Sequence, residues 1–394
     1  MPLVFWPSGP HPFSTAKDWL LVAWFSSGFI IAAATGRMKR RLPPRVAAAV
    51  LVWIVSLSLS ASLGNEASIS ELMRNLFACA GFPLLLWIGI QPRKLALAVT
   101  SSATVVAVIA LLQWAGLDPF LLLNLTGSIE GNSRIRIFST LGNPNFVAAL
   151  LAAVLPLTIG LPAGRLCSPK LWRALQIAAG SLQALAIVAT GSRAPILAFM
   201  AAGIWLLIGG TRLKMRWILA IPAACLLLAL VSPARSLDRT VSGRLYIWRI
   251  ALAHLAFIPP SGYGPGAFPL RFAQWEMDYV RSNPGKPELS FSGPQEHAHN
   301  DYVEFMADYG IVGICAFFTA VGLSLRYPRR RSSGTLELGI GSSVISLLAI
   351  AIVDFPLHRP AELYLLWTQL ALLWIVVDPG DLIPVSENSQ AHTA

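Results

Sequence analysis

Residues 95–115 read Leu95-Ala-Leu-Ala-Val-Thr-Ser-Ser-Ala-Thr-Val-Val-Ala-Val-Ile-Ala-Leu-Leu-Gln-Trp-Ala115, a stretch without a charged side chain. A helix needs about 20 predominantly apolar residues to cross the hydrocarbon core of a bilayer. The stretch therefore predicts a membrane-spanning helix, and the same template predicts ten further spans in the chain of 394 residues. The eleven predicted spans are residues 19–36, 46–63, 74–90, 95–115, 145–162, 174–190, 194–210, 217–232, 303–325, 336–356 and 362–378.

The composition agrees with this pattern of spans. Apolar residues make up 55% of the chain and charged residues only 12%, against roughly 25% charged residues in soluble domains. A disordered chain is excluded, because disorder requires low hydrophobicity and a high density of charge. A soluble enzyme of this length is disfavoured, because so few charges could not cover its surface. The sequence thus predicts an all-α polytopic membrane protein with about 11–12 transmembrane helices.

The basic residues behind the net charge of +11 lie where they would orient the protein in a membrane, and their distribution does not fit a nucleic-acid-binding surface. Nucleic-acid-binding proteins gather basic residues on a polar domain, whereas seventeen of the thirty here lie in five connectors that contain no acidic residue. By the positive-inside rule these connectors are cytoplasmic, which puts the amino terminus outside and the carboxyl terminus inside. The basic connectors are residues 37–45, 91–94, 163–173, 211–216 and 326–335.

The largest connector on the predicted outer face is residues 233–302. It begins with Ser242–Ile258, whose apolar part is too short to span and is expected to lie in the interface as an amphipathic helix. The polar stretch Glu276–Glu296 is expected to be flexible. The chain is predicted to divide into amino-terminal transmembrane helices, a core that contains this large loop, and a cytoplasmic tail, with boundaries at residues 1–130, 131–378 and 379–394.

Ionisable side chains gather at the predicted outer ends of the spans. A pump or ion pathway usually needs ionisable groups at mid-depth, so this placement favours chemistry at the membrane surface. Arg134 and Arg136 precede the span at 145–162, where Asn143 or Asn145 can cap the helix by accepting a backbone N–H. These arginines are either interfacial residues of a capped loop or part of a site.

Three further arginines lie in outer segments. Arg193 occupies the short turn Thr190-Gly-Ser-Arg-Ala-Pro195, where it is either a ligand for a substrate or an anchor for lipid phosphate. In Ser242-Gly-Arg-Leu-Tyr-Ile-Trp-Arg249, Arg244 is the better candidate ligand and Arg249 the better candidate for anchoring a lipid headgroup.

The segment His297-Ala-His-Asn-Asp-Tyr-Val-Glu304 enters the span at 303–325. His299 and Tyr302 are three residues apart and can share a helix face, and Asp301 or Glu304 can orient the imidazole. The sequence does not decide between His297 and His299 as the working histidine. In the outer turn Val353-Asp-Phe-Pro-Leu-His-Arg-Pro360, Asp354 and Arg359 can form either a structural ion pair or part of the site.

Metal binding is not expected. A set of ligands from His297, His299 and Asp301 is conceivable, but the sequence lacks HExxH or DxD spacing around them. The four cysteines show no CxxC spacing, so neither a zinc site nor a disulfide framework is predicted.

In order and spacing, five of these segments resemble the O-antigen ligase and polymerase family of bacterial envelope glycosyltransferases. The first four spans match that family only by being apolar, and the chain shows one span fewer than the family's twelve. The stretches that carry the resemblance are Phe138-Ser-Thr-Leu-Gly-Asn-Pro-Asn145, Thr190-Gly-Ser-Arg193, Gly243-Arg-Leu-Tyr-Ile-Trp248, Gly262-Tyr-Gly-Pro-Gly-Ala-Phe268 and His299-Asn-Asp-Tyr302.

The resemblance implies a helical glycosyltransferase fold of the lipid-donor (GT-C-like) type, which works without a nucleotide sugar. No cofactor is expected, and no metal is required if the arginines supply the positive charge. Such enzymes move a glycan from undecaprenyl diphosphate to an acceptor, commonly the lipid A core, on the periplasmic face of the bacterial inner membrane. The family's essential histidine falls on His299 and its diphosphate-binding arginines on Arg193 and Arg244, with Arg136 as an assisting residue. The candidate supporting residues are Arg134, Asn300, Tyr302 and Glu304.

The chemistry of these residue types agrees with that activity. Guanidinium groups bind phosphate bidentately, and a histidine, with an unperturbed pKa of about 6.5, can accept the proton of an acceptor hydroxyl. Three alternatives stay open. A polymerase would use the same donor and a different acceptor; a lipid-linked-glycan transporter would need charges at mid-span or inverted repeats; and a non-catalytic assembly subunit would tolerate loss of His299 or Arg244.

Overall fold

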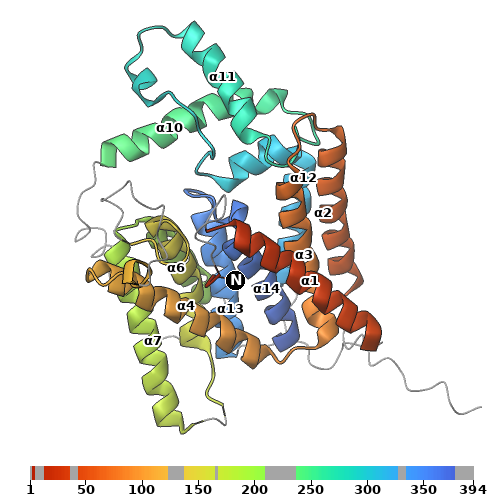
Figure 1. The fold of residues 1–394 in the computed structure, drawn as a ribbon. Coiled ribbons are helices and arrows are strands. Elements are labelled where there is room, and N and C mark those ends of the chain that lie inside the picture. Colours follow the sequence, from red (N-terminus) through yellow and green to blue (C-terminus); the bar gives the residue numbers. More distant parts are fainter. Residues whose placement is uncertain are drawn as a thin grey trace, which may run out of the picture.

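The fold is all-α. A computed structural model describes residues 2–4, 13–35, 43–122, 137–164, 167–208, 237–326 and 334–377, and within these ranges every regular element is a helix. The membrane-type helices are α1 (Thr15–Thr35), α2 (Pro44–Leu63), α3 (Ile69–Ile88), α4 (Pro92–Trp114), α6 (Pro144–Gly160), α7 (Pro169–Thr190), α8 (Ala194–Ile208), α12 (Asp301–Arg326), α13 (Thr335–Ile350) and α14 (Pro360–Val377) (Figure 1). The remaining α-helices are α5 (Pro119–Leu122), α10 (Leu237–His254) and α11 (Phe268–Ser282), with 3₁₀ turns at Leu255–Phe257, Pro287–Phe291 and Pro356–His358.

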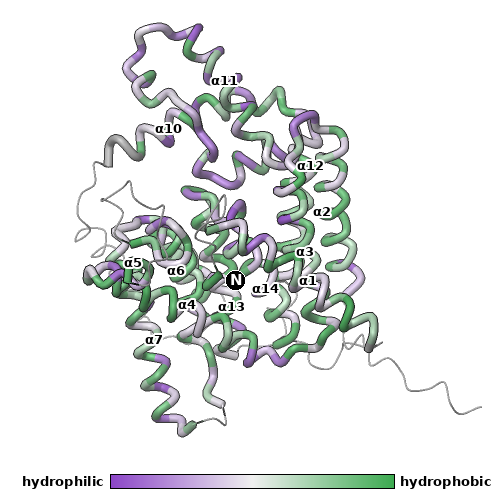
Figure 2. The backbone as a smooth tube through the Cα atoms, viewed as in Figure 1, coloured by the Kyte–Doolittle hydropathy of each residue, from purple (hydrophilic) through white to green (hydrophobic). Residues whose placement is uncertain are grey.

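The helices confirm the prediction of a polytopic membrane protein. Ten of the eleven predicted runs overlap a helix, and the run at 217–232 lies outside the described residues. Within the described ranges, six helices are long and apolar enough to cross a membrane, namely α1, α2, α3, α4, α7 and α12. Four shorter apolar helices accompany them: α6, α8, α13 and α14. Figure 2 shows the hydrophobic colouring that follows the bundle and the hydrophilic segments that gather toward α10 and α11.

Successive membrane helices run in opposite directions, so their polar connections collect at two ends. We define the site end as the end where α3, α6, α8, α12 and α14 begin. There, the Asp18 side chain of α1 accepts a hydrogen bond from Arg74 of α3 (2.8 Å), and Arg74 donates to the carbonyl of His358 before α14 (3.0 Å). At the opposite end, Arg93 donates to the carbonyl of Pro162 (3.2 Å). Two of the predicted basic connectors, 91–94 and 163–173, therefore share one end of the bundle.

Small residues let the end of α6 and the start of α13 approach closely. A Cβ added to Gly160 would lie 2.4 Å from the carbonyl oxygen of Thr335, and one added to Gly339 would lie 2.8 Å from that of Pro156. Close backbone approach through small residues is how membrane helices pack when lipid is as apolar as their side chains. This contact fixes α13, which leads into the turn at 351–359.

The predicted outer loop forms a small subdomain with its own apolar core. Tyr246 and Ile250 of α10 pack with Phe272 and Trp275 of α11 and with Ala298 before α12. Figure 1 shows α10 and α11 above the bundle, beside the first turns of α12. The predicted amphipathic helix is α10, whereas the stretch expected to be flexible is held by the end of α11 and by a 3₁₀ turn. Glu288 of that turn accepts hydrogen bonds from Arg249 (2.7 Å) and Tyr279 (2.5 Å).

Helix α12 is broken at Gly310, where the sequence predicts one continuous span. Gly310 has φ 63° and ψ −170°, and a Cβ there would lie 2.2 Å from the carbonyl oxygen of Pro260. The loop at 260–264 fits along the break, with Tyr263 N–H donating to Ala307 O (2.9 Å) and Val312 N–H donating to Pro260 O (3.1 Å). The loop thus pairs backbone groups that the helix leaves free. Residues 301–309 become a short separate helix that carries the carboxylates Asp301, Glu304 and Asp308.

Candidate active site

His299 and Asn300 are the two residues that directly precede α12. The side-chain oxygen of Asn300 accepts hydrogen bonds from the backbone N–H groups of Tyr302 (3.0 Å) and Val303 (3.2 Å), so Asn300 caps the helix. His299 itself has φ 51°, in the left-handed region. A non-glycine residue there costs roughly 1–3 kcal/mol and persists only when its surroundings hold it. The imidazole side chain is 35% exposed, so it is accessible to a ligand.

Asp354 is the carboxylate that faces His299. Its Oδ1 lies 3.8 Å from Nδ1 of His299, and its Oδ2 accepts a hydrogen bond from Nη1 of Arg359 at 2.9 Å. Burial favours the neutral acid, but the adjacent Arg359 outweighs burial and holds the pKa of Asp354 well below its usual range. Asp354 is therefore ionised, and an anion at this distance stabilises a protonated imidazole. The Asp354–Arg359 ion pair that the sequence offered as one of two interpretations is present.

Arg244 of α10 lies within the electrostatic range of the same carboxylate. Burial lowers the pKa of Arg244, and the charge of Asp354 acts in the opposite direction. The Nε of Arg244 is buried without a hydrogen-bond partner, so this guanidinium retains an unused donor. Arg249, on the same helix, has a 62% exposed side chain and pairs with Glu288 at 2.7 Å. The two arginines therefore differ in their surroundings: Arg244 is partly buried, whereas Arg249 is exposed and binds a carboxylate of its own subdomain. Their predicted roles as ligand and headgroup anchor stay predictions.

Arg193 lies in the turn between α7 and α8. Gly191 has φ 65° and ends α7, which allows the tight turn. Helix α8 packs on α13, where Ser346 Oγ donates to Ala198 O at 3.3 Å. Because Ala198 is early in α8 and Ser346 is late in α13, Arg193 lies at the same end of the bundle as Asp354. Its side chain is half-buried.

The first predicted motif is described in part. Arg134 and Arg136 lie outside the described residues. Asn143 caps α6 by accepting the N–H of Asn145 at 2.8 Å, as predicted. The preceding turn is held by Gln113 of α4, whose side-chain oxygen accepts the N–H of Ser139 at 2.7 Å.

The structure brings Glu304 to a different histidine from the one expected. Glu304 accepts the N–H of Ala298 (2.6 Å) and lies 3.1 Å from Nδ1 of His297. Because the chain turns at His299, the two histidines face different carboxylates, with His297 beside Glu304 and His299 beside Asp354. Tyr302 points toward α13, where its hydroxyl donates to Leu348 O at 2.6 Å.

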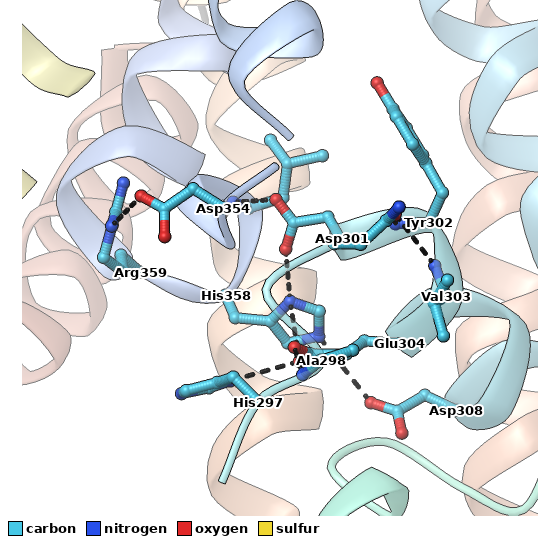
Figure 3. Close-up of polar contacts among 12 residues, drawn as sticks. His297, Ala298, Asp301, Tyr302, Val303, Glu304, Asp308, Asp354, His358 and Arg359 are labelled. Carbon is cyan, nitrogen blue, oxygen red and sulfur yellow. Dashed lines mark hydrogen bonds and ion pairs between the residues drawn. The ribbon is translucent and has the colours of Figure 1, made fainter. Parts of the chain in front are cut away.

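A buried histidine that the sequence reading overlooked lies at the centre of this region. Nδ1 of His358 lies 2.5 Å from Asp301 and 3.4 Å from Glu304, and its Nε2 lies 3.8 Å from Asp308 (Figure 3). The three carboxylates are spaced to share one face of a helix. That spacing in an otherwise apolar span was the available signal. No pattern in the sequence indicated that His358, which lies 57 positions from Asp301, would be their partner.

The weakly supported metal ligands do not converge. His297 contacts Glu304, His299 faces Asp354, and Asp301 binds His358. Within the described ranges, no group of three or more His, Cys, Asp or Glu side chains is arranged to hold a metal ion.

Two pockets open near the site end. One, of about 300 Å³, lies between α1, α6 and α14 and is lined by residues that include Lys17, Phe146 and Arg359. The ring of Phe146 contacts that of Phe355 (5.5 Å between centroids), which also contacts His299 (5.3 Å). A second pocket, of about 160 Å³, is lined mainly by apolar residues of α4, α6 and α14. Ala361 lines both pockets.

The fold and this arrangement define an all-α polytopic membrane protein with a histidine–carboxylate–arginine site at one end of its helices. Residues 178–318 match the family model described as O-antigen ligase. The match supports the assignment of the chain to the O-antigen ligase and polymerase family, as the motifs predict, and thereby indicates an enzyme of the glycosyltransferase type. The matched region contains Arg193, Arg244 and His299, whereas Asp354 and His358 lie beyond it. No curated protein matches the chain.

Proposed function

We propose that the protein is an O-antigen ligase-type glycosyltransferase that moves a glycan from undecaprenyl diphosphate to an acceptor hydroxyl. In this proposal the acceptor is the lipid A core, and the site end faces the periplasm across the bacterial inner membrane. The observation that carries the proposal is the position of Asp354, whose carboxylate lies 3.8 Å from Nδ1 of His299 and whose charge also acts on the guanidinium of Arg244, a residue of another element.

His299 is the proposed general base. The acceptor oxygen attacks the anomeric carbon, the bond from that carbon to the diphosphate oxygen breaks, and the diphosphate leaves with the electron pair. The proton of the acceptor hydroxyl passes to Nε2 of His299, since Nδ1 faces Asp354. The ionised Asp354 then stabilises the imidazolium that forms. General-base catalysis of this kind contributes roughly 10²–10⁴-fold.

Arg244 and Arg193 are the proposed ligands for the diphosphate. Negative charge grows on the leaving group as the glycosidic bond breaks, so fixed cations at that position stabilise the transition state more than the ground state. The unused buried N–H of Arg244 supports its role. Arg136 is proposed to assist. Guanidinium groups in these positions can neutralise the leaving group, and we expect the reaction to proceed without a divalent metal.

The lipid part of the donor requires an apolar surface next to a polar mouth. The two pockets that meet at Ala361 offer this combination, since one is lined by Lys17 and Arg359 and the other by apolar residues of α4, α6 and α14. We propose that the prenyl chain lies along the bundle on this side.

The test is transfer in vitro from a purified glycan-diphosphate-undecaprenol donor to lipid A core, with EDTA present. We expect the wild-type protein to be active and His299→Ala to lose roughly 10²–10⁴-fold in rate. His254→Ala is the matched control, because His254 lies at the end of α10 and stacks on Trp275 (5.0 Å between centroids). Full transfer by His299→Ala would remove His299 from the mechanism, and loss of wild-type activity on adding EDTA would contradict the metal-free proposal.

A polymerase of the same family is the closest alternative, because its donor and chemistry are the same. Offering lipid A core and a second lipid-linked glycan as competing acceptors separates the two activities. A transporter or an assembly subunit would show no transfer with either acceptor, and an assembly subunit would tolerate His299→Ala and Arg244→Ala in the cell.

A further inference from the structure

The cluster around His358 is a group of buried ionisable side chains to which the proposed mechanism assigns no role. The side chain of His358 is 4% exposed, and those of Asp301, Glu304 and Asp308 are at most 2% exposed. Three buried carboxylates thus surround the imidazole of His358, and one of them, Glu304, also lies 3.1 Å from Nδ1 of His297. Buried carboxylates repel one another unless a cation compensates them, and among these four side chains only His358 can carry positive charge.

Each carboxylate of the cluster also holds the backbone of a different segment. Asp301 accepts the N–H of Leu357 at 2.8 Å. Glu304 accepts that of Ala298 at 2.6 Å. Asp308 accepts the N–H of Gly266 at 2.7 Å, at the start of the α11 region. The cluster therefore joins the turn after α13, the segment before α12 and the outer subdomain.

Hydrogen bonds fix the chain on both sides of His299. Ala298, the residue before it, is bound by Glu304. Asp301, two residues after it, is bound through its side chain to His358 and through its N–H to Ala351 O at 2.9 Å. The left-handed conformation of His299 is held between these points. Loss of either point would allow the backbone to relax and the imidazole to move relative to Asp354.

We propose that His358 is a positioning residue, which joins Asp301, Glu304 and Asp308 into one cluster and thereby holds the backbone of His299 in its left-handed conformation. This proposal rests on the proposed function for its catalytic consequence. His358 does not touch the substrate; it acts through the residues on either side of His299.

The charge state of His358 supports this role. Burial disfavours the imidazolium, but Glu304, Asp301 and Asp308 outweigh burial and hold the pKa of His358 well above its ordinary value. His297 also faces it (6.0 Å between ring centroids), as does Arg74 of α3, which donates to the carbonyl of His358 at 3.0 Å. Because the folded-state pKa is raised, the stabilising contribution is present at neutral and acidic pH. It is lost as pH rises through the pKa of His358.

The test compares His358→Asn with the wild type in the full-length, detergent-solubilised protein. Asn keeps a donor near the position of Nδ1 and removes the charge. We expect kcat for glycan transfer to fall about 10²-fold, the loss typical of a small displacement of a catalytic group, while the donor Kd changes little because the arginines remain. The gap in Tm between the two proteins should be full at pH values below about 6.5, the pKa of an unfolded histidine, and should narrow as pH rises from there through the pKa of His358.

A double variant separates charge compensation from simple damage. His358→Asn with Asp301→Asn removes one positive and one negative charge, so the net charge of the cluster matches that of the wild type. We expect the double variant to recover much of the kcat lost in His358→Asn, which is non-additive behaviour for residues in contact. Additive losses would overturn the proposal, as would a wild-type kcat in His358→Asn.

Hydrogen exchange measures the positioning without relying on activity. We expect the amides of Ala298 and Asp301 to exchange about tenfold faster in His358→Asn, because their acceptors are released, and not in His254→Asn. Unchanged exchange at these amides would overturn the proposal. Faster exchange in a protein whose wild type transfers no glycan would support the positioning and refute the proposed function, so the two failures are distinguishable. If His358→Asn does not fold, hydrogen exchange is measured in Asp301→Asn instead. Faster exchange at Ala298 and at residue 301 would then support the proposal, and unchanged exchange would overturn it.

Discussion

At the scale of single residues, the site depends on which carboxylate each cation faces. Asp354 is bound to Arg359 and lies beside His299, and its charge also acts on Arg244. The charge of Asp354 thus acts on both His299, the candidate base, and Arg244, the candidate ligand for the diphosphate. Removing its charge would weaken the stabilisation of protonated His299 and would leave buried Arg359 with Glu362 as its remaining ion-pair partner (3.0 Å).

Arg244 and Arg249 provide a matched pair of variants on the same helix. We expect Arg244→Ala to lower kcat/KM for the lipid-diphosphate donor about 10- to 100-fold, because a charge-assisted hydrogen bond is worth roughly 1.5–3 kcal/mol. Arg249→Ala should leave it unchanged, because its exposed guanidinium pairs with Glu288. Steady-state transfer with varied donor measures both. Equal losses in the two variants would show that the effect comes from α10 as a whole.

The sequence located candidate residues better than it located their partners. His299 and Arg244 stand in recognisable motifs. The structure places His299 3.8 Å from Asp354, and the charge of Asp354 acts on Arg244. The predicted orienting residue, Glu304, instead contacts His297 and His358. The reason is the left-handed conformation of His299, which redirects the chain and which no pattern of residue types reveals. Contacts such as Asp301–His358 arise from tertiary folding and were invisible for the same reason.

At the scale of elements, the break in α12 positions the site. The apolar pattern continues on both sides of Gly310, so the sequence predicted a single span at 303–325. The structure divides it because the loop at 260–264 occupies the space where a helix would continue. The predicted spans were otherwise reliable, since the 20-residue apolar requirement comes from the bilayer and does not depend on tertiary contacts.

Gly310 can be tested against Gly285, another glycine with a positive φ but with open surroundings. Gly310→Ala places a Cβ 2.2 Å from Pro260 O, whereas Gly285 has φ 79° and nothing within 4 Å of the added Cβ. Both variants place an alanine at a positive φ, and Gly310, with φ 63° and ψ −170°, lies in a region that is essentially restricted to glycine. Only Gly310→Ala adds the clash with Pro260. We expect a clearly larger fall in Tm for Gly310→Ala, with reduced transfer by the folded protein. Equal Tm values in the two variants would contradict the account of the break.

At the scale of the whole molecule, the two ends of the bundle have different chemistry. The site end carries the buried carboxylates, the histidines and the subdomain of α10 and α11. The opposite end carries the basic connectors at 91–94 and 163–173. The predicted orientation, with the site end outside, follows from the positive-inside rule and stays a prediction, as do the domain boundaries at 130 and 378.

Labelling of cysteines in intact cells tests this orientation. Cys167 lies in a basic connector, and Ser282 is exposed at the end of α11. In variants that retain one cysteine each, a membrane-impermeant maleimide should label Ser282→Cys when only the outer membrane is opened. It should label Cys167 only after the inner membrane is permeabilised. The reverse pattern would invert the proposed topology and place the site in the cytoplasm.

The division of roles between the arginines and His299 is tested most directly by equilibrium binding of the lipid-diphosphate-glycan donor to the purified variants. The account predicts that His299→Ala binds the donor with a wild-type Kd and fails to transfer it. Arg193→Ala and Arg244→Ala should each raise that Kd about tenfold or more, in line with a lost charge-assisted hydrogen bond. A wild-type Kd in both arginine variants, or lost binding in His299→Ala, would contradict it.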